Sequence, residues 1–156
     1  MADKETLLSL LIKVLKLVFN LAVIIMYRVG DGGYFLGIGG TWNLNEEKTA
    51  DSEIIASGVF VGFFIYTAVV LVAFLFGPTD YFKRGVSDTI MNFIGAFMWI
   101  SVGGTALHYW NSYVSEREYP EWTSERGVGL GMGVMCVFTS ILYFVDTVVA
   151  LLHSTR

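Results

Sequence analysis

The residues that could carry chemistry in this chain are the few ionisable side chains inside long apolar segments. Lys13 and Lys16 lie in the first segment, His108 lies near the end of the third and Asp146 lies near the end of the last. A charge in hydrocarbon is costly, so each such residue calls for a partner or a functional role. Lys13 and Asp146 both lie roughly 9 Å from the ends of their segments, at 1.5 Å per helical residue. Depth alone therefore allows Asp146 to pair with Lys13 or with Lys16.

Each of these residues also has a simpler explanation. The stem of Lys13 is long enough to carry its ammonium group to the lipid headgroups, so we expect Lys13 to snorkel. Asp146 is too short for that and is expected to have a partner. A proton or ion path is disfavoured because no other span supplies an acidic partner. Asn20 and Asn92 are expected to form hydrogen bonds between helices.

No arrangement of residues indicates catalysis, a cofactor or a metal. His108 has no histidine, cysteine or carboxylate at the spacing of metal ligands, and Cys136 is the only cysteine. An enzyme acting on lipids would need such groups at one depth, whereas His108 and Asp146 belong to opposite ends of their segments. The net charge is −4 and no basic patch is present, so nucleic acid is not expected as a partner. The sequence predicts a protein that is not an enzyme and needs no cofactor.

The elements that must position these side chains are four apolar segments of about 20 residues or more, each long enough to cross ~30 Å of hydrocarbon as a helix. Hydrophobic residues make up 54 % of the 156 residues and charged residues 15 %, and the mean hydropathy is +0.61. We predict an all-α membrane protein in which residues 1–156 form one four-helix transmembrane domain in the lipid bilayer. The predicted spans are residues 7–27, 54–76, 89–110 and 127–152.

Small residues recur at helical spacing in three of the spans. In lipid, helices associate where small side chains allow close approach. Gly58 and Gly62 share a face of the second span, Gly103 lies in the third, and Gly127 and Gly131 share a face of the fourth. We predict that these glycines mediate helix packing within the bundle. A contact face for a second protein is the alternative.

The distribution of basic residues favours cytoplasmic termini. With both termini inside, six of the ten Lys and Arg residues lie on the inner side, which agrees with the positive-inside rule. Gly77-Pro78 ends the second span, and Ser87 or Asp88 is expected to cap the third helix. The inner loop between them is short, so the second and third spans should be antiparallel neighbours.

Two outer loops would then carry an acidic and aromatic surface. Glycine-rich turns in the first loop bracket the apolar stretch 34–38, which favours a small β-hairpin. Tyr27, Tyr109 and Trp110 fit an aromatic belt at headgroup depth. Trp42 lies in mid-loop and needs something to pack on, so we expect the loops to carry an interaction site. Its candidate residues are Tyr34, Trp42, Asn43, Asn45, Tyr119 and Trp122.

Several stretches, with the four-span layout, resemble the snakeskin family of smooth septate junction proteins in arthropod gut epithelia. The stretches are Ile12-Lys13-Val14-Leu15-Lys16-Leu17, Gly37-Ile38-Gly39-Gly40-Thr41-Trp42-Asn43-Leu44-Asn45-Glu46-Glu47-Lys48, Ala56-Ser57-Gly58-Val59-Phe60-Val61-Gly62, Ser87-Asp88-Thr89-Ile90-Met91-Asn92-Phe93 and Ala106-Leu107-His108-Tyr109-Trp110. The resemblance extends over the full chain.

The resemblance implies a structural role in the paracellular barrier, at the plasma membrane of cell–cell contacts. It also implies association with the large single-span protein Mesh and a tetraspanin, and homo-oligomers are expected. The claudins are a distant analogy, but their loop tryptophan is paired with two loop cysteines, which this chain lacks. A subunit of an oligomeric channel or transporter is the alternative, although polar residues are scattered among the spans rather than aligned along two of them.

Overall fold

The computed structural model describes residues 4–30, 32, 37–38, 50–77, 86–113 and 124–154, and helices form nearly all of this part of the chain. Four helices are long and apolar enough to cross a membrane. The elements are α1 (Lys4–Val29), α2 (Ala50–Phe76), α4 (Val86–His108), the π-helical segment η1 (Tyr109–Tyr113) that continues α4, and α6 (Ser124–Ser154).

The helices contain all four predicted spans and extend beyond most of their ends. The predicted β-hairpin is not shown. Residues 31, 33–36 and 39–49 lie outside the described residues, and the described part of that loop, Gly32, Gly37 and Ile38, forms turns. After α1, Gly30 adopts a φ of 56° and its N–H donates to the carbonyl of Met26 at 3.0 Å. This is the left-handed helix end that glycine favours.

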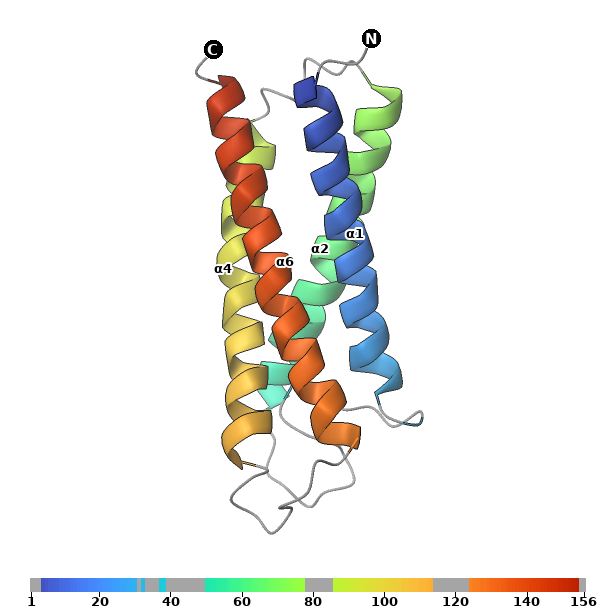
Figure 1. The fold of residues 1–156 in the computed structure, drawn as a ribbon, viewed down its shortest axis with the longest axis vertical. Helices are drawn as coiled ribbons and strands as arrows, with labels where there is room; N and C mark the ends of the chain where they lie inside the picture. The colour runs from blue at the N-terminus through green and yellow to red at the C-terminus, as the bar shows by residue number, and fades with distance from the viewer. Residues whose placement is uncertain are drawn as a thin grey trace.

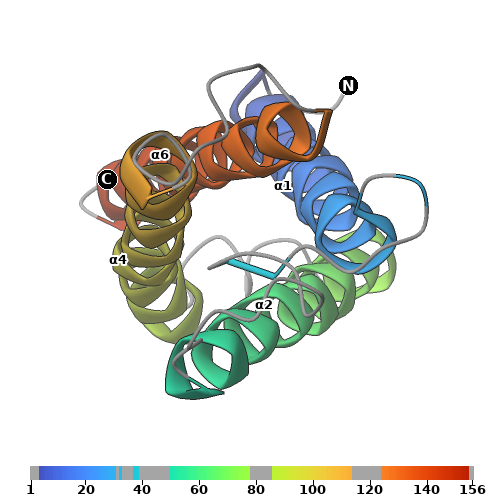
Figure 2. The same ribbon diagram turned by 90° about the horizontal axis from the view of Figure 1, so that it is seen from below.

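The four helices form a ring in the order α1, α2, α4, α6, as the view along the bundle shows (Figure 2). Helix α1 begins, and α6 ends, at the same end of the bundle (Figure 1). We call this the terminal end and the opposite one the loop end. The most extensive contact is between α4 and α6. Helices α2 and α4 are antiparallel neighbours as predicted, but their contact is the smallest of those between adjacent helices.

Glycines explain the close approach of α4 and α6. A Cβ added to Gly103 on α4 would lie 2.8 Å from the Cβ of Cys136 and 3.1 Å from the carbonyl oxygen of Gly133. A Cβ on Gly133 would meet Leu107 at 2.7 Å, and one on Gly129 would meet the Trp110 ring at 2.4 Å. The contact therefore depends on residues without side chains.

Aromatic rings fill the middle of the bundle. The Phe60 ring from α2 lies 5.0 Å from that of Tyr27 on α1 and 5.2 Å from that of Trp99 on α4. The Tyr143 ring of α6 stacks on Trp99 at 6.4 Å and makes an edge contact with Phe63 at 5.3 Å. All four helices thus contribute to one aromatic core.

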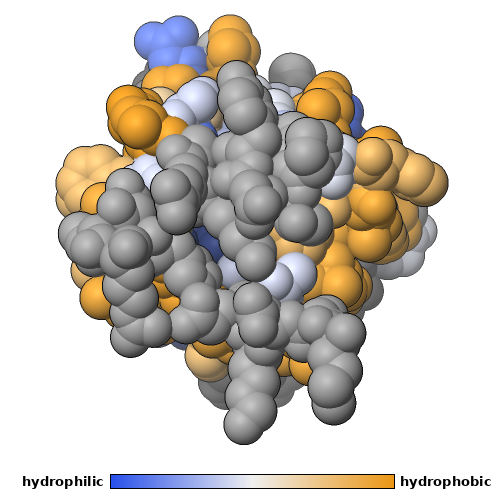
Figure 3. Space-filling view, turned by 90° about the horizontal axis from the view of Figure 1, so that it is seen from above, coloured by the Kyte–Doolittle hydropathy of each residue, from blue (hydrophilic) through white to orange (hydrophobic). Residues whose placement is uncertain are grey.

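The outward surface of the helices is apolar. Exposed large hydrophobic residues line every span, among them Leu11, Ile65, Phe97 and Phe144. Hydrophobic residues also occupy much of the rim in the view onto the terminal end (Figure 3). A surface of this kind suits lipid tails, so the chain is a multi-pass membrane protein.

Candidate functional site

A cluster of charged side chains is buried between all four helices in the terminal half of the bundle. Lys13 and Lys16 are one turn apart on α1, and their side chains are 5 % and 2 % exposed. The Lys13 Nζ lies 2.9 Å from Asp88 Oδ2 and 3.2 Å from Asp146 Oδ2. The Lys16 Nζ lies 2.5 Å from the same Asp146 oxygen. Two cations therefore face two carboxylates, and the formal charges cancel.

Neutral side chains complete this cluster. Asn92 on α4 accepts a hydrogen bond from Lys16 Nζ at 2.7 Å and donates to Asp146 Oδ2 at 3.0 Å. Tyr66 on α2 donates its hydroxyl to Asp88 Oδ1 at 2.6 Å. In a site without bulk water, each donor and acceptor needs such a partner. We call Lys13, Lys16, Tyr66, Asp88, Asn92 and Asp146 the charged cluster.

A second polar layer lies next to the charged cluster, toward the loop end. The Tyr143 hydroxyl accepts from Asn20 Nδ2 at 3.0 Å and shares a hydrogen bond with Thr67 Oγ1 at 2.6 Å. Lys16 Nζ lies 4.3 Å from the centre of the Tyr143 ring, within the range of a cation–π contact. Tyr143 thus connects the charged cluster to the aromatic core.

The structure brings together most of the polar span residues noted in the sequence. Asp146 has the partners expected for it, and both lysines supply them. Snorkelling of Lys13 is wrong, because carboxylates from α4 and α6 hold its ammonium group inside the bundle. Asn20 and Asn92 make interhelical hydrogen bonds.

The sequence analysis proposed Asp88 as a helix cap, and this role is wrong. Asp88 lies inside the first turn of α4 rather than at the cap, and its carboxylate binds Lys13 and Tyr66. Its signal in the sequence was the spacing to Asn92, four residues later, which places both on one helical face. Tyr66, Thr67 and Tyr143 had no signal, since tyrosine and threonine are common in apolar helices.

The aromatic residues near the loop end are also placed differently from expectation. Tyr27 and Trp110 are almost fully buried in the bundle, so the interpretation as an aromatic belt is wrong for both. Arg126 on α6 donates to the carbonyl of Trp110 at 3.1 Å and to that of Asn111 at 3.4 Å. It thereby satisfies carbonyl groups near the end of the α4–η1 helix.

The predicted glycines divide into two groups. A Cβ on Gly103 would collide with α6, and one on Gly131 would meet the end of the Met26 side chain at 3.2 Å. Gly58, Gly62 and Gly127 have nothing within 4 Å of that position. These three are exposed on the outside of the bundle, so a contact with another molecule remains a prediction for them.

The predicted loop site falls outside the described part of the chain. Tyr34, Trp42, Asn43, Asn45, Tyr119 and Trp122 all lie outside the described residues. Within the described ranges, no group of three His, Cys, Asp or Glu residues could hold a metal ion. His108 lies on the exposed face of α4 at the loop end.

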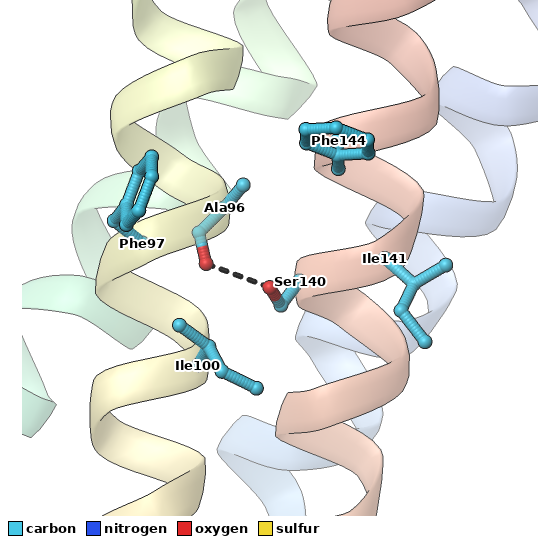
Figure 4. Close-up of a pocket in the computed structure, with 6 residues that line it drawn as sticks. All are labelled: Ala96, Phe97, Ile100, Ser140, Ile141 and Phe144. Carbon is cyan, nitrogen blue, oxygen red and sulfur yellow. Dashed lines mark hydrogen bonds between the residues drawn. The ribbon is translucent and has the colours of Figure 1, made fainter.

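A shallow apolar groove runs between α4 and α6 on the outer surface of the bundle. It encloses about 310 Å³ and is lined by Ala96, Phe97, Ile100, Ser140, Ile141 and Phe144. Its one hydroxyl, that of Ser140, points at α4 and donates to the Ala96 carbonyl at 2.7 Å (Figure 4). The groove therefore offers apolar contact without a free polar group, as expected of a lipid-facing surface.

These features define a class: a four-helix multi-pass membrane protein held together by a charge-balanced cluster buried between its spans. The chain belongs to the snakeskin family. It is 56 % identical over 156 residues to the protein snakeskin of Drosophila melanogaster, covering all of this chain and 96 % of that protein. It is 47 % identical over 156 residues to the protein snakeskin of Bombyx mori, covering 99 % of it. No family model matches the chain, and no solved structure matches it.

Proposed function

We propose that this protein is a non-enzymatic structural component of smooth septate junctions and contributes to the epithelial paracellular barrier. In this proposal it resides in the plasma membrane at cell–cell contacts, with both termini in the cytoplasm. Full-length membership of the snakeskin family supports the assignment. The common position of the start of α1 and the end of α6 supports the shared side of the termini.

The single observation in the structure that carries this proposal is the filled centre of the bundle. Phe60, Trp99 and Tyr143 come from three different helices and have no exposed surface. Their rings contact one another in series across the interior. A path for ions or solutes through one copy would have to pass these rings and the charged cluster. The arrangement favours a rigid support for the loops over a transport pathway.

The outer surface offers a place for association between copies. Gly58 and Gly62 lie one turn apart on the exposed side of α2, where a second helix could approach closely. We propose that homo-oligomers form laterally through such faces. Other junction membrane proteins, a Mesh-like single-span protein and a tetraspanin, are the further partners that family membership leads us to propose.

The outer loops are proposed to make the contacts, either within one membrane or across the gap between cells. Trp42 and Trp122 are the side chains we expect to matter most, because tryptophan is enriched among the residues that dominate protein interfaces. The experiment replaces Trp42 with Ala in epithelial cells that lack the endogenous protein. We expect reduced delivery to cell borders and increased flux of a paracellular tracer.

The matched control is Phe76→Ala, which removes an aromatic side chain that is 86 % exposed. Phe76 closes α2 at the terminal end of the bundle, away from the outer loops. The Phe76→Ala variant should leave border delivery and tracer flux at wild-type levels. Thermal unfolding of both purified variants separates a contact defect from misfolding. Normal border delivery and normal flux in Trp42→Ala would contradict the proposed contact.

One observation favours a channel subunit as the second candidate. Ser101 and Thr105 lie on the exposed side of α4 at hydrocarbon depth, where a pore between copies would need polar groups. Both hydroxyls donate to carbonyls one turn earlier, at 2.7 and 3.0 Å. Ion flux through liposomes that contain the purified protein would support this candidate, provided that Thr105→Val reduces the flux.

A further inference from the structure

The loop that follows α1 returns to the bundle at Ile38. This side chain is only 2 % exposed and belongs to the hydrophobic core, together with Tyr27, Ala56 and Phe60. The Ile38 backbone N–H donates to Glu53 Oε1 on α2 at 2.8 Å. A point in the middle of the first outer loop is therefore tied to the bundle by both an apolar and a polar contact.

Glu53 uses its second oxygen to tie in the neighbouring helix. The Tyr27 hydroxyl on α1 lies 2.9 Å from Glu53 Oε2 and 3.3 Å from the Glu53 carbonyl. One carboxylate thus joins α1, the loop and the first turn of α2. Hydrogen bonds to an ionised acceptor are roughly twice as strong as neutral ones, so this contact can hold the loop against the bundle.

Gly37 is the residue that makes this contact possible. Its φ is +64°, and a Cβ at this position would lie 2.5 Å from Glu53 Oε1. Gly32 in the same loop has the same φ of +64°, but nothing lies within 4 Å of its Cβ position. Gly32 and Gly37 therefore have the same backbone conformation, but only Gly37 lies close to Glu53.

We propose that Glu53, Tyr27, Gly37 and Ile38 form a latch that fixes the first outer loop against the bundle and so positions the loop residues that make junction contacts. The second part of this statement rests on the proposed function. Trp42 follows Ile38 by only four residues along the chain, so the latch is next in sequence to a residue that we expect to make these contacts. Glu53 is a positioning residue because it acts through the loop backbone, and Tyr27 is one because it acts through Glu53.

The test is hydrogen exchange, followed by mass spectrometry, on the purified full chain in lipid nanodiscs. Glu53→Ala removes the two hydrogen bonds that the carboxylate accepts, from Tyr27 and from Ile38. Gly37→Ala places a methyl group against the Glu53 carboxylate and should displace it from the Ile38 N–H. Both variants should exchange the segment containing Ile38 about tenfold faster or more, which is the expected result of losing a hydrogen bond to a charged group. Segments from α4 and α6 should keep their wild-type protection.

Two matched controls isolate the latch. Asp51→Ala also removes an acidic residue from the first turn of α2, but its side chain is exposed. Gly32→Ala imposes the same backbone strain without the collision. Both should retain wild-type exchange at Ile38. If Glu53→Ala loses protection throughout the chain, Tyr27→Phe provides the milder variant, which removes one hydroxyl and should still accelerate exchange at Ile38.

Wild-type exchange at Ile38 in Gly37→Ala and Tyr27→Phe would overturn the latch, and so would equal acceleration in the controls. Border delivery and tracer flux of the latch variants then test the positioning role. Faster exchange with normal delivery and flux would overturn that role and leave the latch standing. Neither exchange result depends on the junction assignment, so failure of the latch and failure of the proposed function are distinguishable.

Discussion

The two halves of the bundle hold their helices together with different forces. In the terminal half, ionic and hydrogen-bonding side chains from α1, α2 and α4 converge on Asp88 of α4 and Asp146 of α6. In the loop half, α4 and α6 meet through close packing at Gly103 and Gly129, with the Trp110 ring lying against the second of these. Both halves hold antiparallel helices together in lipid, where the hydrophobic effect contributes little between helices.

The two forces specify different properties of the bundle. A buried charge must meet its counter-charge, so the terminal half specifies which helices are neighbours and at what register. Close packing penalises added volume but not a change of partner, so the loop half sets how near the helices lie. Loss of one charge should accordingly cost more than addition of one methyl group. This ranking is open to experiment.

The largest effect is expected from Asp146→Leu. The substitution leaves Lys16 without a carboxylate and Lys13 with Asp88 alone. Removing one partner from a buried ion pair costs about 3–5 kcal/mol. Thermal unfolding of the purified protein in detergent should show a large drop in the midpoint, together with a low yield of folded protein.

The double variant Lys16→Met with Asp146→Leu distinguishes charge balance from lost packing. It keeps the pair of Lys13 and Asp88, which is neutral as a unit, and fills the space of the other pair with apolar side chains. Replacement of a whole buried pair is often neutral or stabilising. We expect the double variant to recover most of the stability lost in Asp146→Leu, and equal destabilisation of both variants would refute the electrostatic explanation.

An intermediate effect is expected from overpacking in the loop half. Gly103→Ala places a methyl group 2.8 Å from the Cβ of Cys136, next to the backbone of α6. Such insertions cost about 1–3 kcal/mol. Gly104→Ala is the matched control, because nothing lies within 4 Å of its Cβ position. The unfolding midpoint should fall for Gly103→Ala only. An equal fall for both variants would contradict the explanation by close packing of α4 against α6.

A smaller effect is expected where the two halves meet. Tyr143→Phe keeps the ring contacts with Phe63 and Trp99 but removes the hydroxyl shared with Thr67 and Asn20. The loss of a typical buried hydrogen bond costs about 1 kcal/mol. The free energy of unfolding should fall by this amount. A drop as large as that of Asp146→Leu would mean that the second polar layer belongs energetically to the charged cluster.

The sequence predicted the spans well, because twenty-residue apolar segments leave little freedom in lipid. It also predicted that Asp146 has a partner, since a short acidic side chain cannot reach the headgroups. It wrongly favoured snorkelling for Lys13, because the sequence does not show that α4 and α6 bring Asp88 and Asp146 to the same depth. The burial of Trp110 could not be predicted from the sequence either, since it depends on Gly129, which faces the Trp110 ring across the contact between the α4–η1 helix and α6.

The smallest effect on stability is expected from substitutions at Gly58 and Gly62, which contact neither the charged cluster nor the α4–α6 interface. Leucine at either position would project into open space, so the free energy of unfolding should stay within about 0.5 kcal/mol of wild type. If copies associate through this face of α2, the same variants should weaken self-association, measured by energy transfer between labelled copies in liposomes. Val69→Ala, on the exposed side of α2, controls for a general change of surface. Unaltered self-association in both leucine variants would remove this face of α2 from the proposed assembly.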